Sequence, residues 1–103
     1  MEPISSELLL TKLQQWIGKN IYIHIEINPG GYFRNGKALL DRVHIKGHGS
    51  FRVFLELDQH QSIIHVDDLT HMSIADELVI VTGYDTYDRL ARTLEISSRP
   101  FPI

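Results

Sequence analysis

Two polar side chains near the start of the chain have the types and the spacing of metal ligands. His24 and Glu26 are separated by a single isoleucine. Alternate residues of a strand lie on one face, so the imidazole and the carboxylate would lie side by side. With a third ligand from a neighbouring strand, they would hold a divalent ion that lowers the pKa of a bound water. His44 and His48 are the candidates for that third ligand, and such a site would make the protein a hydrolytic or lyase enzyme.

The same pattern also has a simpler interpretation. Histidine and glutamate that alternate with isoleucines are typical of the solvated face of a half-buried strand. No recognised zinc motif surrounds the pair, and no order of Ser, His and Asp marks a nucleophilic triad. Both interpretations therefore stay open, with the non-catalytic one favoured. We expect no cofactor in that case, and a divalent metal only in the enzymatic alternative.

Aromatic and basic residues in two loops suit ligand recognition instead. Tyr32 and Arg34 lie in a glycine-flanked segment, and Tyr84 and Tyr87 lie near aspartates that are typical of a turn. Tyrosine and arginine are enriched where proteins recognise partners, and a tyrosine ring offers both a stacking face and a hydroxyl group. These four residues are the candidate ligand-binding residues.

Composition excludes several classes of function. The chain has 103 residues and no cysteine, which excludes disulfides, thiolate metal sites and cysteine nucleophiles. Its formal net charge is −3 and no basic run exists, so we expect no binding to nucleic acid. No apolar run exceeds four residues, which is too short to span a membrane. We therefore expect a cytoplasmic protein that makes no membrane contact.

One helix and a series of short strands must position the candidate residues. Apolar residues at three- and four-residue spacing predict a helix over residues 6–17, with Ser6 as its cap and Gly18 as its end. Beyond it, apolar residues alternate in short runs between turn signals, with no second helix between them. The predicted strands cover residues 21–28, 40–46, 51–57, 62–66, 70–74, 78–83 and 89–97.

This spacing predicts a mainly β (α+β) fold, an antiparallel β-barrel-like domain of six to seven short strands with one N-terminal helix. We expect the whole chain, residues 1–103, to form one domain. If the predicted strand register is right, seven side chains face the core. They are Ile23, Ile25, Val53, Leu55, Val79, Val81 and Leu94.

Three segments, over residues 21–26, 45–53 and 94–101, follow one another in a specific order and spacing. Together they resemble the YojF-like family of small uncharacterised bacterial proteins. The resemblance implies a β-barrel-like fold, a homo-oligomer, and no assigned activity or catalytic residue. Some relatives are encoded beside a zinc-dependent N-acetylglucosaminyl deacetylase of the bacillithiol pathway, which implies an accessory role with a partner enzyme. We therefore expect a homodimer that serves as a non-catalytic accessory or ligand/protein-binding module.

Overall fold

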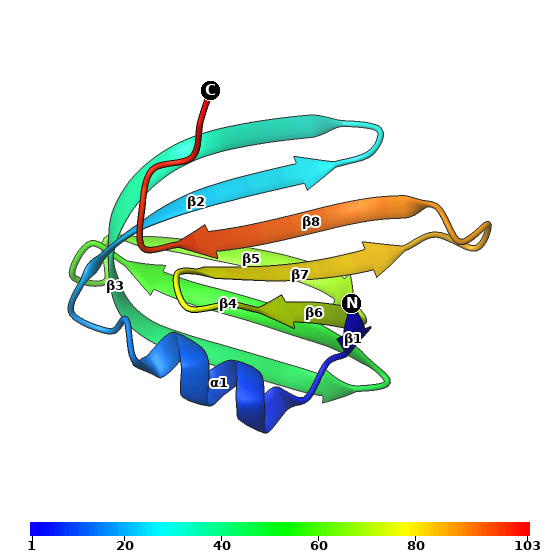
Figure 1. The fold of residues 1–103 in the computed structure, drawn as a ribbon, viewed down its shortest axis with the longest axis horizontal. Helices are drawn as coiled ribbons and strands as arrows, with labels where there is room; N and C mark the ends of the chain where they lie inside the picture. The colour runs from blue at the N-terminus through cyan, green and yellow to red at the C-terminus, as the bar shows by residue number, and fades with distance from the viewer.

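Hydrogen bonds join eight strands into one antiparallel sheet in the computed structural model, which describes residues 1–103 (Figure 1). The spatial order of the strands is β1-β6-β7-β8-β2-β3-β4-β5. The elements are β1 (Glu2–Pro3), α1 (Ser6–Gln14), β2 (Asn20–Ile27), β3 (Gly31–His48), β4 (Ser50–Leu57), β5 (Ser62–Leu69), β6 (His71–Ile74), β7 (Leu78–Tyr84) and β8 (Leu90–Ser97).

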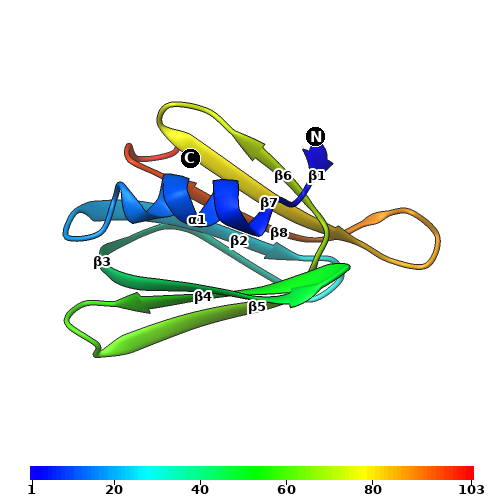
Figure 2. The ribbon, with the colours of Figure 1, turned by 90° about the horizontal axis from the view of Figure 1, so that it is seen from below.

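The long strand β3 folds the sheet over on itself. Its first half pairs with β2, from Ile27↔Gly31 to Asn20↔Leu39, and its second half pairs with β4 up to His48↔Ser50. The sheet therefore forms two layers with the core between them. Figure 2 shows the layer of β6, β7, β8 and β2 above the layer of β4 and β5, with β3 passing from one to the other.

The sheet is not closed into a barrel, which corrects the barrel-like expectation. The two edge strands, β1 and β5, pair with β6 and β4 and not with each other. Strand β1 has only two residues, and Pro3 has no N–H group to donate, so this edge cannot carry a long ladder. Helix α1 contacts both β3 and β6 and covers the opening between the layers instead.

The core lies between the two layers and under the helix. Six of the seven side chains expected to face it are buried, and Ile25 is half-buried, so the predicted inward face of the strands is confirmed. The helix contributes Leu9 and Leu13, which are fully buried. Trp16 is 7% exposed and joins them from the turn after the helix.

The helix is shorter than its apolar pattern predicts. It begins at Ser6 as predicted, but its N-cap is Ser5, because the side chain of Ser5 accepts a hydrogen bond from the Leu8 N–H at 3.2 Å. It ends at Gln14, where the chain turns through tighter hydrogen bonds such as Trp16 N–H to Leu13 O. Gly18 then takes a φ of +84° and donates its N–H to Leu40 O, which directs the chain into β2.

Strand β3 is much longer than the strand predicted over residues 40–46. The segment before it, with Tyr32 and Arg34, was expected to be a loop because of its glycines, yet it pairs with β2. The pairing tolerates them because a register shift between Ile23 and Ile25 absorbs the irregularity. The ring of Phe33 fills the space that a side chain at Gly36 would need, although Phe33 itself stays 53% exposed.

Candidate functional site

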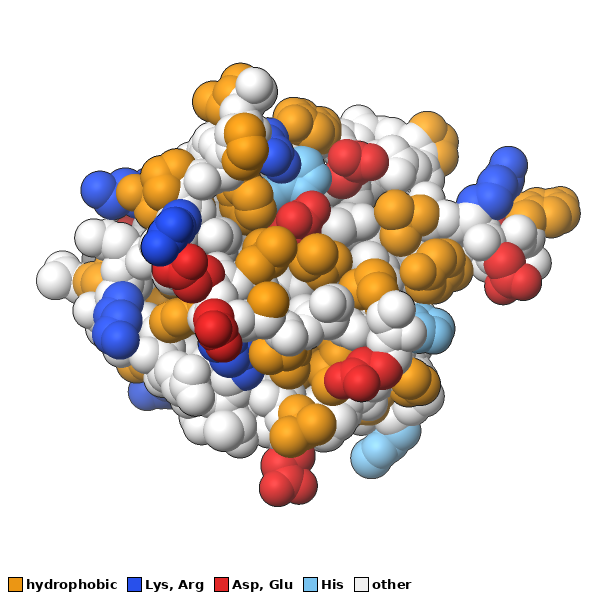
Figure 3. Space-filling view, viewed as in Figure 1, with side chains coloured by type: hydrophobic (Ala, Val, Ile, Leu, Met, Phe, Trp, Pro, Cys, Tyr) orange, Lys and Arg blue, Asp and Glu red, His pale blue; other side chains and the backbone are white.

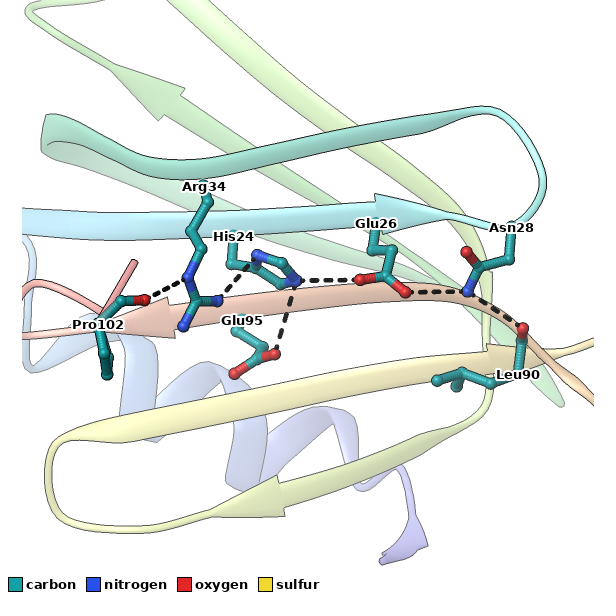
Figure 4. Close-up of polar contacts among 7 residues, drawn as sticks. All are labelled: His24, Glu26, Asn28, Arg34, Leu90, Glu95 and Pro102. Atoms are coloured by element: carbon teal, nitrogen blue, oxygen red, sulfur yellow. Dashed lines mark hydrogen bonds and ion pairs between the residues drawn. The ribbon is translucent and has the colours of Figure 1, made fainter.

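A buried histidine lies on the outer face of the sheet, the side of β2 and β8 that points away from the core. His24 is only 5% exposed, although we expected it on a solvated face. The β2–β8 register places Glu95 directly across from His24, and Arg34 approaches from β3 at the register shift. We call His24, Glu26, Arg34 and Glu95 the His24 cluster (Figure 4).

The two ring nitrogens of His24 face opposite kinds of charge. Nδ1 lies 3.2 Å from the Nη1 atom of Arg34. Nε2 lies 3.6 Å from Glu26 Oε1 and 3.9 Å from Glu95 Oε2, both longer than an ordinary hydrogen bond. Two carboxylates against one guanidinium leave the cluster with a formal charge of −1 when the imidazole is neutral.

The segment after β8 holds Arg34 in place. The Nε atom of Arg34 donates to Pro102 O at 2.7 Å, and the guanidinium lies 4.8 Å from the ring centre of Phe101. Asn35 fixes that segment from its other side. Its side-chain Nδ2 donates to Phe101 O at 2.7 Å, and its Oδ1 accepts from Phe101 N–H at 2.6 Å.

Tyr32 forms an aromatic wall beside the cluster. Its ring meets the imidazole of His24 edge-on, with 5.1 Å between the ring centres, yet the residue is 66% exposed. Figure 3, which has the viewing direction of Figure 1, shows a histidine between acidic and basic side chains, with hydrophobic side chains around them. The site is therefore a shallow, charged surface with an accessible ring at its border.

A hollow lies beside Asn28, where β2 ends and β8 begins. Asn28 donates from Nδ2 to Glu26 Oε2 at 3.1 Å and lies 3.5 Å from Leu90 O. It also lines a hollow of about 530 Å³ together with Pro29, Asp85, Arg89 and Leu90. Asn28 therefore connects the cluster, through Glu26, to the lining of this hollow.

The structure does not bring His44 or His48 to His24. They lie on the second half of β3, and because β3 crosses between the layers, its outer face there points away from that of β2. His44 instead bonds Glu56 at 2.5 Å, and His48 lies at the β3–β4 turn. No group of three or more His, Asp and Glu side chains in the structure is placed to hold a metal ion.

Tyr84 and Tyr87 do not join the His24 cluster either. Tyr84 meets His71 edge-on at 5.3 Å, and Tyr87 is 77% exposed with Arg89 5.0 Å from its ring centre. Both lie at the β7–β8 turn, which borders the hollow through Asp85 and Arg89. Of the four candidate ligand-binding residues, Tyr32 and Arg34 therefore belong to one site, and Tyr84 and Tyr87 lie apart from it.

The aspartate of this turn has a structural role. Asp85 accepts from the N–H groups of Tyr87 and Arg89 through Oδ1, and from Arg89 Nε through Oδ2. The backbone hydrogen bond from Arg89, ahead of the other contacts, lowers the pKa of the Asp85 carboxyl below its usual value. Its acceptors are thus occupied by the turn itself.

Sequence patterns identified only part of the His24 cluster. Glu26 was placed beside His24 because the two are alternate residues of one strand. Glu95 and Arg34 reach the histidine through pairings of β2 with β8 and of β2 with β3, and the register of such pairings is not encoded in local spacing. No local signal in the sequence could have placed these two side chains at His24.

Comparison with known proteins agrees with this fold. Residues 3–101 match the family described as "Protein of unknown function (DUF1806)", and the chain belongs to that family. It is similar to the uncharacterized protein YojF of Bacillus subtilis (strain 168), with 27% identity over the full length of both chains. The crystal structure of B. subtilis YojF superimposes with a TM-score of 0.88 at 28% identity, over 99% of this chain and 97% of that one.

These comparisons assign no activity. The family is one of unknown function, and the relative is uncharacterised. No helix of the structure combines the length and the apolar character that crossing a bilayer requires. Any functional conclusion must therefore come from the geometry of the site.

Proposed function

We propose that the protein is a non-catalytic binding module and that the His24 cluster is where it contacts a polar ligand. One observation carries the proposal: a histidine that is 95% buried directs Nε2 toward two carboxylates with no hydrogen bond in between. Nε2 is not among the fully buried side-chain atoms that lack a partner, so it reaches the surface of the site. A donor between two carboxylates and beside an exposed aromatic ring is where a polar ligand can bind.

Mass spectrometry under non-denaturing conditions tests this proposal. Protein purified from its native host is compared with a Glu26→Gln, Glu95→Gln double variant, which removes both negative charges with little change of shape. We expect a retained small molecule on the unsubstituted protein and its loss from the double variant. Glu77→Gln is the matched control, because Glu77 lies outside the cluster and pairs with Arg99. Equal retention by all three proteins would contradict the assignment of the site.

The accessory role is the second part of the proposal. The resemblance to the YojF-like family supports a cytoplasmic partner enzyme, the zinc-dependent N-acetylglucosaminyl deacetylase of the bacillithiol pathway. Affinity purification of the tagged protein from its native host should recover that enzyme in a stoichiometric amount. Recovery only at the level of an unrelated tagged protein would remove the accessory role and leave the ligand site untouched.

We also propose a homodimer. The edge of β5 opposite β4 has no strand partner, and Ile63 on that strand is 61% exposed. Unpaired strand edges are usually covered, charged or paired with another chain. Light scattering at micromolar concentration should give twice the 11.9 kDa of one chain, and a clean 11.9 kDa particle would rule the dimer out.

A further inference from the structure

We infer that the His24 cluster binds hydroxyl groups of a neutral polyol, such as a monosaccharide, in preference to a metal ion or an amine. This inference rests on the proposed ligand-binding role and adds the chemical class of the ligand. It follows from which nitrogen of His24 carries the proton, and the contact with Arg34 determines that.

Arg34 fixes the tautomer of His24. A guanidinium has only N–H donors and keeps its proton at any ordinary pH, so a nitrogen 3.2 Å from Arg34 Nη1 must act as an acceptor. Nδ1 of His24 therefore presents its lone pair to Arg34. In the neutral imidazole the single proton then lies on Nε2, the nitrogen that faces Glu26 and Glu95.

Arg34 is not free to release this contact. Its Nε donates to Pro102 O, its plane lies against the ring of Phe101, and Asn35 makes two hydrogen bonds to that same residue. The ring of His24 also lies 6.0 Å from that of Phe101, centre to centre. These contacts hold the guanidinium against Nδ1, so the orientation of the imidazole is set before any ligand arrives.

The cluster therefore presents one hydrogen-bond donor, the Nε2–H of His24, between two acceptors, the carboxylates of Glu26 and Glu95. The distances of 3.6 and 3.9 Å from Nε2 to the carboxylate oxygens of Glu26 and Glu95 are too long for good direct hydrogen bonds. A hydroxyl oxygen beside Nε2 would accept from the N–H and donate its own hydrogen to one carboxylate. A second hydroxyl on the adjacent carbon would donate to the other carboxylate. Neighbouring hydroxyl groups of this kind define a sugar or a similar polyol.

Thr93 lies on the same face of the sheet as the His24 cluster but contributes no accessible atom to it. Thr93 lies directly across from Glu26 in the β2–β8 register and therefore on the same face, and it is 6% exposed. Its Oγ1 is the only fully buried side-chain polar atom in the structure without a hydrogen-bond partner. Because this atom has no accessible surface, a ligand on the outer face would reach it only after the neighbouring side chains shift, so the inference rests on His24, Glu26 and Glu95.

The two other ligand classes conflict with the Arg34 contact. A metal on Nε2 would require the imidazole proton to move to Nδ1, where it would oppose the donors of Arg34. An ammonium group has donors only: it could donate to the two carboxylates, but it would leave the Nε2–H without an acceptor. A hydroxyl group both donates and accepts, and it fits without any change in the cluster. The exposed ring of Tyr32 and the hollow beyond Asn28 provide apolar contact and room for the rest of a monosaccharide.

Imidazole nitrogen NMR of the full chain tests the tautomer directly. At pH 7.5 we expect an unprotonated Nδ1 and a protonated Nε2 for His24, with the signals assigned by their loss in His24→Gln. The Arg34→Met variant should shift the population toward the other tautomer, because it removes the donor that selects it. A proton on Nδ1 in the unsubstituted protein would overturn the inference.

Three probes then separate the ligand classes: methyl α-glucoside, n-butylamine and zinc chloride, each titrated while the His24 signals are followed. We expect saturable changes with the glucoside in the millimolar range, and about tenfold weaker binding in Glu95→Gln from the loss of one hydrogen bond to a charged group. Glu77→Gln should bind as the unsubstituted protein does. Saturation by zinc or the amine but not by the glucoside would overturn the polyol inference alone, and no response to any probe would overturn both it and the proposed binding role.

Discussion

Glu56 lies between two histidines on the outer face of the second layer. His44 Nε2 lies 2.5 Å from Glu56 Oε2, and His60 Nδ1 lies 2.9 Å from Glu56 Oε1. The hydrogen bond from His44, and next the one from His60, lowers the pKa of the Glu56 carboxyl below its ordinary value of 4.5. The carboxylate of Glu56 therefore bonds two of the six histidines, His44 and His60, and His44 is one of the predicted metal ligands.

This pairing predicts a pH-dependent contribution to stability. Because the pKa of Glu56 is lower in the folded state, its contribution is complete above pH 4.5 and is lost as the pH falls through the folded-state pKa. Urea unfolding at pH 6 should show Glu56→Gln to be less stable than the unsubstituted protein, and the difference should shrink toward pH 3. Glu2→Gln serves as control, because Glu2 is exposed and has no side-chain hydrogen bond. A difference independent of pH would contradict the assignment.

Thr93 gives a second prediction at the scale of a single residue. Its buried hydroxyl has no partner, so Thr93→Val removes an unsatisfied polar group and keeps the shape of the side chain. The free energy of unfolding should rise by about 1 kcal/mol in the absence of ligand. Thr82→Val is the matched control, since the hydroxyl of Thr82 donates to Met1 Sδ at 3.7 Å. If the Thr93→Val variant were less stable than the Thr82→Val variant, the hydroxyl of Thr93 would have a hydrogen-bond partner in solution.

At the scale of the elements, local sequence patterns located most strands and the inward face of each. The alternation of Ile21, Ile23 and Ile25 with polar residues is sufficient for that, because burial of one face imposes a period of two. The same patterns could not show that β3 begins at Gly31, since its early pairing depends on the curvature and bulge of β2. Nor could they show that β8 pairs with β2 and so brings Glu95 to His24.

A tight contact between β7 and the end of β5 gives a prediction at this scale. A Cβ atom added to Gly83 of β7 would lie 2.0 Å from the backbone oxygen of Asp68 on β5. Because backbone cannot swing aside as a side chain does, Gly83→Ala should lower the free energy of unfolding by about 1–3 kcal/mol. Chemical denaturation measures this loss. In Gly31→Ala the new methyl group meets nothing within 4 Å, so a comparable loss in that variant would contradict the packing argument.

Helix α1 should also be required for a stable core. Leu13 is fully buried in the opening that the helix covers, so Leu13→Ala should cost about 2–5 kcal/mol of unfolding free energy. Leu8 is 57% exposed on the same helix, and Leu8→Ala should change stability by about 0.5 kcal/mol or less. If thermal or urea unfolding gave equal losses for the two, the helix would not cover the core as described.

At the scale of the whole molecule, charge is balanced close to neutrality. The formal charge is −3 with neutral histidines, and six histidines raise it as the pH falls, so the sequence pI is 6.0. Since proteins associate most readily where their net charge vanishes, solubility should be lowest near pH 6 and rise toward pH 8. Light scattering of concentrated samples across this range checks the prediction. A solubility that falls steadily from pH 6 to pH 8 would contradict it.

The place of β8 in the sheet has a consequence for how the chain folds. Strand β8 fills the space between β2 and β7, so Ile25 of β2, already paired with Phe33 of β3, finds its second partner only in Leu94, near the end of the chain. Until β8 docks, two largely apolar strands present open edges to other chains. Pairings this distant in sequence also make folding slow. The nascent chain should therefore depend on rapid docking of its last strand, and the time before that docking is when it is most exposed to aggregation.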